Sequence, residues 1–223
     1  MNTKTQQLSG KVTKALTGLK GFDSDTIINK DTANKFKKDG YSFCFRYLSR
    51  EKGQQDGDLS FQEANDILNS GLALSAVQHV SSPGWIPTGS LGTTYGENAA
   101  YNAASIGLPK GMNIWCDLEG IAKGTDSNTV IAYCNAWYDA VYKAGYIPGI
   151  YIGANAILNS QQLYWDIKFQ HFWKSMSNVP CVANRGYQLI QSSQPNHING
   201  ISIDEDITHN DYKGDSVLWL VKE

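Results

Sequence analysis

The 223-residue sequence predicts a single α/β domain, a (β/α)8 TIM-type barrel, on the basis of three observations. Short apolar runs alternate with longer amphipathic stretches, which is the pattern of βαβ units around a parallel sheet. The chain is 41% hydrophobic and only 18% charged, so it can bury a sizeable core. Its length fits one barrel and leaves little room for a second domain.

The start of the chain predicts a polar lead-in to the first strand. Residues 1–18 are rich in Thr, Gln and Lys and show no clear period, so we expect an N-terminal tail there and a barrel over residues 19–223. The first strand is expected around residues 21–23. Helical spacing over residues 31–39 stops at Gly40, a residue suited to ending a helix.

The middle of the chain repeats this alternation of strand and helix. Asp58 or Ser60 can cap a helix that Gly71 ends, and Glu63, three residues after Ser60, would complete a capping box. A loop rich in Pro and Gly at residues 81–92 precedes an alanine-rich helix. Strands are expected over residues 41–47, 72–80, 112–117 and 147–152, and helices over residues 60–70, 95–106 and 126–144.

The last third of the sequence predicts a less regular structure. Three further strands are expected over residues 169–175, 186–190 and 201–207, which makes about eight in all. The connections between these strands are too short for full helices. We therefore expect a barrel that is irregular in its last strands.

Composition and charge restrict the partners of the chain. The 19 basic and 21 acidic side chains are spread along the sequence and nearly cancel, so nucleic acid is not an expected partner. No apolar run has the length of a signal peptide or a membrane span. We expect synthesis in the cytoplasm without a signal peptide, with release or delivery if the substrate lies in the cell wall; no delivery partner is indicated.

The cysteines lack C-x-x-C spacing and are expected to be buried free thiols, namely Cys44, Cys116, Cys134 and Cys181.

Polar side chains gather at the expected C-terminal ends of the strands, where parallel barrels hold their active sites. These residues are Asp23, Arg46, Tyr47, Asp117, Glu119, Tyr151, Gln188, Asp204 and Asp206. The group is rich in carboxyl side chains, which favours acid and base chemistry at this end of the barrel.

The strongest local signal is an apolar strand that runs directly into Asp117 and Glu119. Side chains two apart on a strand point the same way, so both carboxyls can face one sugar, and their repulsion favours one staying protonated near neutral pH. Glu119 is the expected general acid, because its side chain is longer and more distal. Asp117 is expected to stay ionised, and to stabilise positive charge or orient an N-acetyl group. The alternative is a helix cap or a loop salt bridge.

The other candidates also have structural alternatives. Asp23, with Ser24 and Asp25 behind it, could cap the first helix, and residues 204–206 could form a solvated acidic turn. Arg46 is expected to face the barrel interior and to pair with Asp23, more as support for the site than as a catalytic group.

Aromatic side chains near strand ends are candidate sugar platforms, because sugars stack their apolar faces on aromatic rings. These are Tyr47, Trp85, Tyr151 and Trp173, whereas Trp115 and Trp137 are expected in the core. The histidines lack the spacing of a metal site, and no phosphate loop or dinucleotide motif is present. Four acidic groups could in principle hold Mg²⁺ or Ca²⁺, but we expect neither a metal nor a cofactor.

Several of these motifs resemble those of family 25 lysozymes. Gly21-Phe22-Asp23 resembles their opening G-x-D, Asp117-Leu118-Glu119 resembles their D-x-E on the fourth strand, and residues 203–206 resemble their closing aspartate strand. Residues 149–151, 172–173 and 187–188 resemble the family's tyrosine, tryptophan and aromatic-Gln strands. A closer resemblance, over about residues 19–221, is to the glycoside-hydrolase-like domains related to these lysozymes, because the second strand carries Phe45-Arg46-Tyr47.

The resemblance implies a function as well as a fold. It implies Glu119 as acid/base, Asp117 as the stabilising carboxylate, and Asp23 and Asp204 as substrate-orienting groups with Tyr151. The predicted function is hydrolysis of the glycan of bacterial peptidoglycan, as by a muramidase. Two alternatives use the same barrel: an inactive glycan-binding module, and a structural or interaction domain.

Overall fold

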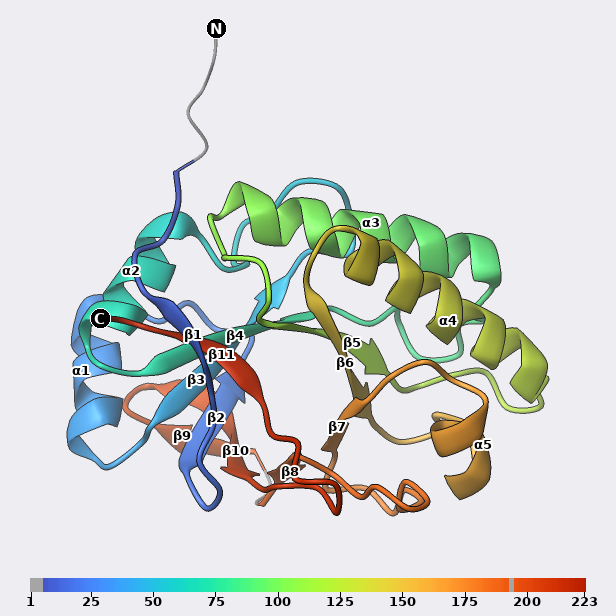
Figure 1. The fold of residues 1–223 in the computed structure, drawn as a ribbon. Helices are drawn as coiled ribbons and strands as arrows, with labels where there is room; N and C mark the ends of the chain where they lie inside the picture. Colours follow the sequence, from blue (N-terminus) through green and yellow to red (C-terminus); the bar gives the residue numbers. More distant parts are fainter. Residues whose placement is uncertain (1–5, 193–194) are drawn as a thin grey trace, which may run out of the picture.

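The computed structural model describes residues 6–192 and 195–223, and its centre is a closed barrel (Figure 1). Going round the described barrel, each strand pairs with the next and the last pairs with the first. The strands are β2 (Lys20–Ser24), β3 (Phe43–Leu48), β4 (Ala73–Gln78), β5 (Asn113–Leu118), β6 (Ile147–Ile152), β7 (His171–Lys174), β8 (Leu189–Gln191) and β10 (Ile201–Thr208). The predicted TIM-type architecture is confirmed.

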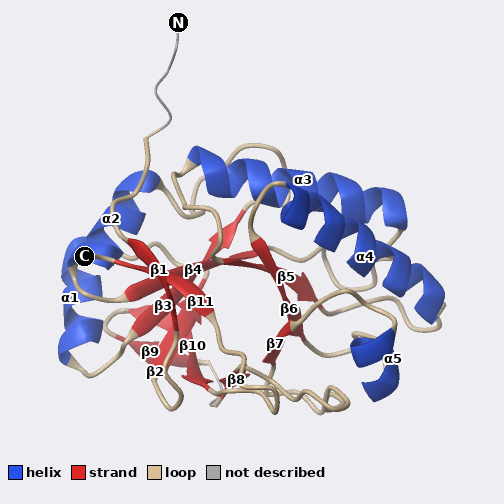
Figure 2. Cartoon of the chain, in the orientation of Figure 1, coloured by secondary structure: helices blue, strands red, loops and turns tan. Residues whose placement is uncertain are grey.

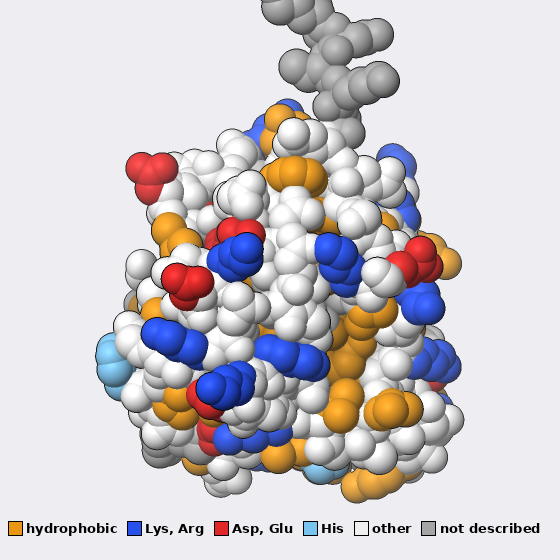
Figure 3. Space-filling model, turned by 90° about the vertical axis from the view of Figure 1, so that its left-hand side faces the viewer, with side chains coloured by type: hydrophobic (Ala, Val, Ile, Leu, Met, Phe, Trp, Pro, Cys, Tyr) orange, Lys and Arg blue, Asp and Glu red, His pale blue; other side chains and the backbone are white. Residues whose placement is uncertain are grey.

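Helices cover the barrel at the left, top and right of the view, and loops cover its lower edge (Figure 2). The helices are α1 (Lys30–Lys38), α2 (Phe61–Asn69), α3 (Gly89–Ser105), α4 (Ser127–Lys143) and the short α5 (Ser160–Trp165), which the sequence did not predict. In the described residues no helix lies between β7 and β10. The predicted irregularity of the last strands is therefore confirmed. On the side of α1 and α2, Lys and Arg side chains are scattered among acidic and uncharged ones (Figure 3).

The final barrel strand runs against the others. β2 to β8 are parallel to their neighbours, but β10 pairs antiparallel with both β2 and β8. It is preceded by β9 (Asn196–Ile198), joined to it by a tight turn in which Asn199 and Gly200 both have positive φ, at 54° and 87°. An Asn-Gly pair favours this kind of hairpin turn. An antiparallel neighbour needs no helical crossover, which explains why the chain closes the barrel without one.

Part of the expected N-terminal tail forms a strand. β1 (Lys11–Lys14) pairs antiparallel with β11 (Leu218–Val221), and β11 continues onto β4. Trp219 of β11 packs on Phe43 inside the barrel, with 5.0 Å between ring centroids. The two ends of the chain thus close the floor of the barrel, opposite the mouth.

Two apolar cores follow from the period of two along each strand. One fills the barrel interior and includes Phe43, Phe45, Val77, Trp115, Trp173 and Leu189. The other lies between the barrel and the helices and includes Cys44, Cys116, Cys134 and Trp137. The expected burial of Trp115 and Trp137 is confirmed. The expectation of four buried thiols is wrong for Cys181, which is exposed in a loop.

Helix α3 begins well before the expected residue 95, because Thr88 caps it and Gly89 starts it. The glycines that suggested a loop instead allow α3 to approach α4. A Cβ atom built on Gly92 would lie 2.2 Å from the Tyr133 carbonyl oxygen, and one on Gly96 would lie 2.7 Å from that of Trp137. Glycine lowers helix propensity but permits this close contact between backbones.

We expect Gly92→Ala to destabilise the protein by about 1–3 kcal/mol, because overpacking outweighs the gain of about 1 kcal/mol in helix propensity. Gly89→Ala is the matched control, since a Cβ atom there would only make ordinary contacts at 3.8 Å. Urea unfolding followed by circular dichroism measures both variants. Equal midpoints for the two would show that the close approach carries no cost.

Candidate active site

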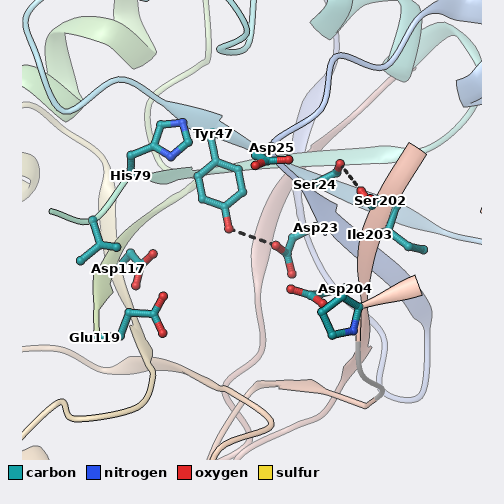
Figure 4. A pocket seen from close by; sticks show the side chains of 12 residues that line it. Asp23, Ser24, Asp25, Tyr47, His79, Asp117, Glu119, Ser202, Ile203 and Asp204 are labelled. Carbon is teal, nitrogen blue, oxygen red and sulfur yellow. Dashed lines mark hydrogen bonds between the residues drawn. The ribbon is translucent and has the colours of Figure 1, made fainter. Parts of the chain in front are cut away.

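One open pocket of about 360 Å³ lies at the mouth of the barrel (Figure 4). It is lined by Asp23, Ser24, Asp25, Tyr47, His79, Val80, Asp117, Glu119, Pro195, Ser202, Ile203 and Asp204. A smaller inner part is lined in addition by Val77, Tyr151, Trp173 and Gln191. The C-terminal ends of the parallel strands meet here, as expected for a barrel of this kind.

Asp117 and Glu119 form one wall of the pocket. Asp117 lies on β5 and Glu119 directly after it, and both carboxyls point into the pocket (Figure 4). Glycine at position 153 leaves room for Glu119, since a Cβ atom there would lie 2.3 Å from Oε2 of its carboxyl group. The backbone of Glu119 is fixed by Trp85, whose indole Nε1 donates to its carbonyl oxygen at 2.8 Å. The predicted pair is thus brought to one wall.

Burial raises the pKa of both carboxyls. It raises the pKa of Asp117 well above its ordinary value, and the nearby charges of Glu119 and Asp23 add to the effect. The pKa of the more exposed Glu119 is also raised, by burial and by the charge of Asp204. Burial therefore opposes the expectation that Asp117 stays ionised while Glu119 alone holds the proton.

Asp23 and Asp204 form the opposite wall. They are directly opposite each other on β2 and β10, and their carboxyls face each other (Figure 4). The Gln191 side-chain amide donates to both, at 3.2 Å to Asp23 and 3.4 Å to Asp204. The Tyr47 hydroxyl donates to the other oxygen of Asp23 at 3.1 Å. Neither structural alternative holds, because Asn29 caps α1 and Asp204 lies within a strand.

Burial and the charge of Asp204 raise the pKa of Asp23 to about 7. The native state then holds a proton that the unfolded chain loses above its ordinary value near 3.8, so stability falls as pH rises between about 4 and 7. Between pH 4 and pH 8 we expect the free energy of unfolding of wild type to fall more than that of Asp23→Asn. The difference between the two falls should be on the order of 2–4 kcal/mol. Urea unfolding at both pH values measures this difference. Parallel profiles for the two proteins would contradict the raised pKa.

Asp206 does not reach the mouth, contrary to expectation. β10 runs from the mouth toward the floor, so Asp206 lies two residues deeper than Asp204. It is fully buried, and its Oδ1 accepts a hydrogen bond from Trp173 Nε1 at 2.9 Å. This residue supports the barrel interior beneath Asp23.

Arg46 faces away from the pocket, so both its expected inward orientation and its pairing with Asp23 are wrong. The barrel interior is occupied by Phe45 and Tyr47, which leaves Arg46 on the outer face under α2. It is fully buried, and its Nε donates to Oε1 of Glu63 at 2.6 Å. Its guanidinium also donates to the backbone carbonyls of Ser24 and Gly57. Glu63 therefore does not complete the predicted capping box, although Ser60 does cap α2.

Gln188 also lies outside the pocket, and Gln191 takes the expected place. The buried Gln188 side chain accepts from the Phe172 amide at 2.6 Å and donates to Asp211 at 2.7 Å. Gln191 instead lines the inner pocket and accepts from the Tyr151 hydroxyl at 3.0 Å. Side chains two apart on a strand share a face, so the inward-facing Leu189 could have identified Gln191 as a pocket residue.

Three of the four aromatic residues expected to stack on a sugar line the pocket, and one does not. Tyr47 and Tyr151 line the pocket, and the buried Trp173 closes its inner part. Trp85 is not a lining residue, because it packs on Tyr133 and holds the backbone after β5.

Ser24, Asp25 and His79 line the pocket and were not among the predicted site residues. Asp25 follows Asp23 by two, which is the same spacing that identified Asp117 and Glu119. The His79 ring stacks on the Tyr47 ring, with 4.5 Å between ring centroids, and its Nε2 lies 2.9 Å from Oδ1 of Asp58.

Two further properties concern metals and membranes. Over residues 6–192 and 195–223, no group of three or more His, Cys, Asp or Glu side chains is arranged to hold a metal ion. None of the described helices combines the length and the apolar character needed to cross a membrane.

The family model for the Rv2525c-like, glycoside hydrolase-like domain matches residues 34–214. The chain belongs to this family. The resemblance noted in the sequence is confirmed, as is the relation to lysozyme-like barrels described next. No curated protein sequence matches the chain.

Solved structures share the fold of this Rv2525c-like domain at low sequence identity. The Tat-secreted protein Rv2525c of Mycobacterium tuberculosis, in complex with L-tartrate, has a TM-score of 0.65 at 16% identity, covering 87% of this chain and 96% of the other. A bacterial lysozyme from Streptomyces coelicolor has a TM-score of 0.59 at 18% identity, covering 87% and 94%. A family 25 glycosyl hydrolase from Bacillus anthracis has a TM-score of 0.59 at 16% identity, covering 88% and 91%.

Proposed function

We propose that this protein is a glycoside hydrolase that cleaves the glycan of bacterial peptidoglycan, with Glu119 as the acid. The observation that carries the proposal is the pocket itself, in which the carboxyls of Asp117 and Glu119 face those of Asp23 and Asp204. Glycosidases cleave with a pair of carboxyl groups, one of which acts as the acid while the other stabilises the charge that develops on the sugar. The lysozyme and glycosyl hydrolase neighbours support a carbohydrate substrate.

Each group then has a role that follows from its position. Glu119, whose pKa is raised by burial, is placed to donate a proton to the leaving glycosidic oxygen. Asp117 lies beside it, and the positive charge that develops on the sugar favours its ionised form. Water then adds to the anomeric carbon in place of the leaving oxygen and returns a proton to Glu119. Oδ1 of Asp117 has no hydrogen-bond partner within the described chain, so it can accept from the N–H of an N-acetyl group.

The opposite wall holds the sugar rather than cleaving it. Asp23 and Asp204 offer carboxyl oxygens to sugar hydroxyls. The Tyr47 hydroxyl donates to Asp23, and the Tyr151 hydroxyl donates to Gln191, which in turn donates to Asp23, so these groups hold the carboxyls that orient the sugar ring. These groups are preorganised by hydrogen bonds to one another, which lowers the entropy cost of binding. A cell-wall substrate requires action outside the cytoplasm, and the Mycobacterium tuberculosis neighbour is a Tat-secreted protein.

The test is digestion of purified peptidoglycan, followed by borohydride reduction and identification of the new reducing ends. We expect reduced muramic acid, as a muramidase would produce, and reduced glucosamine would assign the other glycosidic bond. Absence of any reducing end from folded protein would refute hydrolysis. Retention on the insoluble peptidoglycan without release would support the glycan-binding alternative.

A further inference from the structure

The pocket carries a strong excess of negative groups. Its carboxyl side chains are Asp23, Asp25, Asp117, Glu119 and Asp204, and no lysine or arginine lines its described walls. The imidazole of His79 is already engaged by Asp58 and stacked on Tyr47. The basic side chains lie instead on outer surfaces such as the face of α1 and α2 (Figure 3).

The wall of Asp23, Asp25 and Asp204 has more acceptors than donors. Asp23 and Asp204 are cross-strand neighbours and share one amide group, that of Gln191. Asp25 lies at the exposed rim, where its Oδ1 accepts from the hydroxyl of the adjacent Thr26 at 3.3 Å. A carboxylate can accept about four hydrogen bonds, so this wall has unused capacity for a donor with positive charge.

The wall of Asp117 and Glu119 also has a carboxyl oxygen without a hydrogen-bond donor, which is a separate observation. Asp117 is only 7% exposed, and its Oδ1 has no partner within the described chain although the carboxyl points into the pocket. A buried acceptor without a partner is unfavourable, so a donor that reaches it stabilises the complex. A ligand that donates hydrogen bonds from several positions would therefore satisfy both walls.

We infer that the pocket selects a glycan strand containing hexosamine units whose amino groups are free, and that it binds the ammonium against Asp25 and Asp204. The inference rests on the proposed function and narrows its substrate to partly N-deacetylated glycan. A free ammonium offers three donors and a positive charge, whereas an acetamido group offers one N–H donor and no charge. Hydrogen bonds between charged partners are about twice as strong as neutral ones.

Calorimetric titration compares the β-1,4-linked tetramer of glucosamine with that of N-acetylglucosamine, in a Glu119→Gln background so that neither is cleaved. We expect the free-amine tetramer to bind roughly 10- to 100-fold more tightly at low salt, and the preference to shrink as salt screens the charges. Spermidine, a flexible cation without sugar rings, is expected to bind much more weakly than the free-amine tetramer.

Two variants locate the ammonium. Asp25→Asn should remove most of the preference while leaving affinity for the acetylated tetramer unchanged. Asp204→Asn should weaken binding of the free-amine tetramer more than binding of the acetylated tetramer, because Asp204 also contacts sugar hydroxyls. Asp31→Asn, on the exposed first turn of α1, is the matched control and should retain the preference. Equal affinity for the two tetramers, spermidine binding as tight as the free-amine tetramer, or an equal loss for both tetramers in the Asn variants would overturn the inference.

The outcome separates this inference from the proposed function. Cleavage of peptidoglycan without a preference for free amines would overturn the inference and leave the hydrolase intact. An Asp25-dependent preference without cleavage would support the inference and refute hydrolysis.

Discussion

Glu119→Gln is expected to lower kcat for peptidoglycan cleavage by about 10²- to 10⁴-fold, which is the contribution of a positioned general acid. The substitution keeps the shape of the side chain and removes the transferable proton. KM should change little, because a glutamine still fills the space beside Gly153. Initial rates of reducing-end release at several substrate concentrations measure both constants.

Glu97→Gln is the matched control for this variant. Glu97 lies on the exposed face of α3, outside the pocket, so the same chemical change should leave kcat at the wild-type value. Circular dichroism should show wild-type folding for both variants. If Glu119→Gln retained more than half of the wild-type kcat, another group would have to supply the proton.

Glu63→Gln is expected to destabilise the protein by about 3–5 kcal/mol, because it leaves the charge of Arg46 buried without its partner. The ion pair joins β3 to α2, and both side chains are almost fully buried. The Arg46 guanidinium also fixes the carbonyl of Ser24, which lies between the pocket residues Asp23 and Asp25. Urea unfolding measures the change in free energy of unfolding.

Asp139→Asn is the matched control, since Asp139 pairs with Lys168 on the surface, where both side chains are about half exposed. Exposed pairs contribute about 0–1 kcal/mol, so this variant should differ little from wild type. Replacement of both buried partners by apolar residues, Arg46→Met with Glu63→Leu, should recover part of the lost stability. Similar losses for Glu63→Gln and Asp139→Asn would argue that Arg46 is not held by this pair.

The sequence by itself was sufficient for most of the barrel and for one wall of the site. Strand β6 has the predicted bounds, and α4 begins one residue after its expected start, because Asp126 caps it. Asp117 and Glu119 were predictable because a parallel strand ends at the mouth and residues two apart share a face. These are local properties, which depend on period and on neighbours along the chain.

Other features depended on strand direction, which the two-residue period of a strand does not specify. The last strand was expected to end at the mouth with Asp204 and Asp206, but β10 runs toward the floor and buries Asp206. The Asn199-Gly200 turn was the local signal for this reversal. Without it, a parallel crossover was the natural expectation.

The choice between the two faces of a strand was made only by tertiary packing. A period of two groups Cys44 with Arg46, and Gln188 with Ile190, but it does not say which group faces the barrel interior. That depends on what covers each face. Glu63 on α2 provides a partner for Arg46 outside the barrel, and Asp211 provides one for Gln188. The sequence thus determined which residues share a face and where strands end, while distant charged partners and the direction of β10 decided which side chains form the pocket.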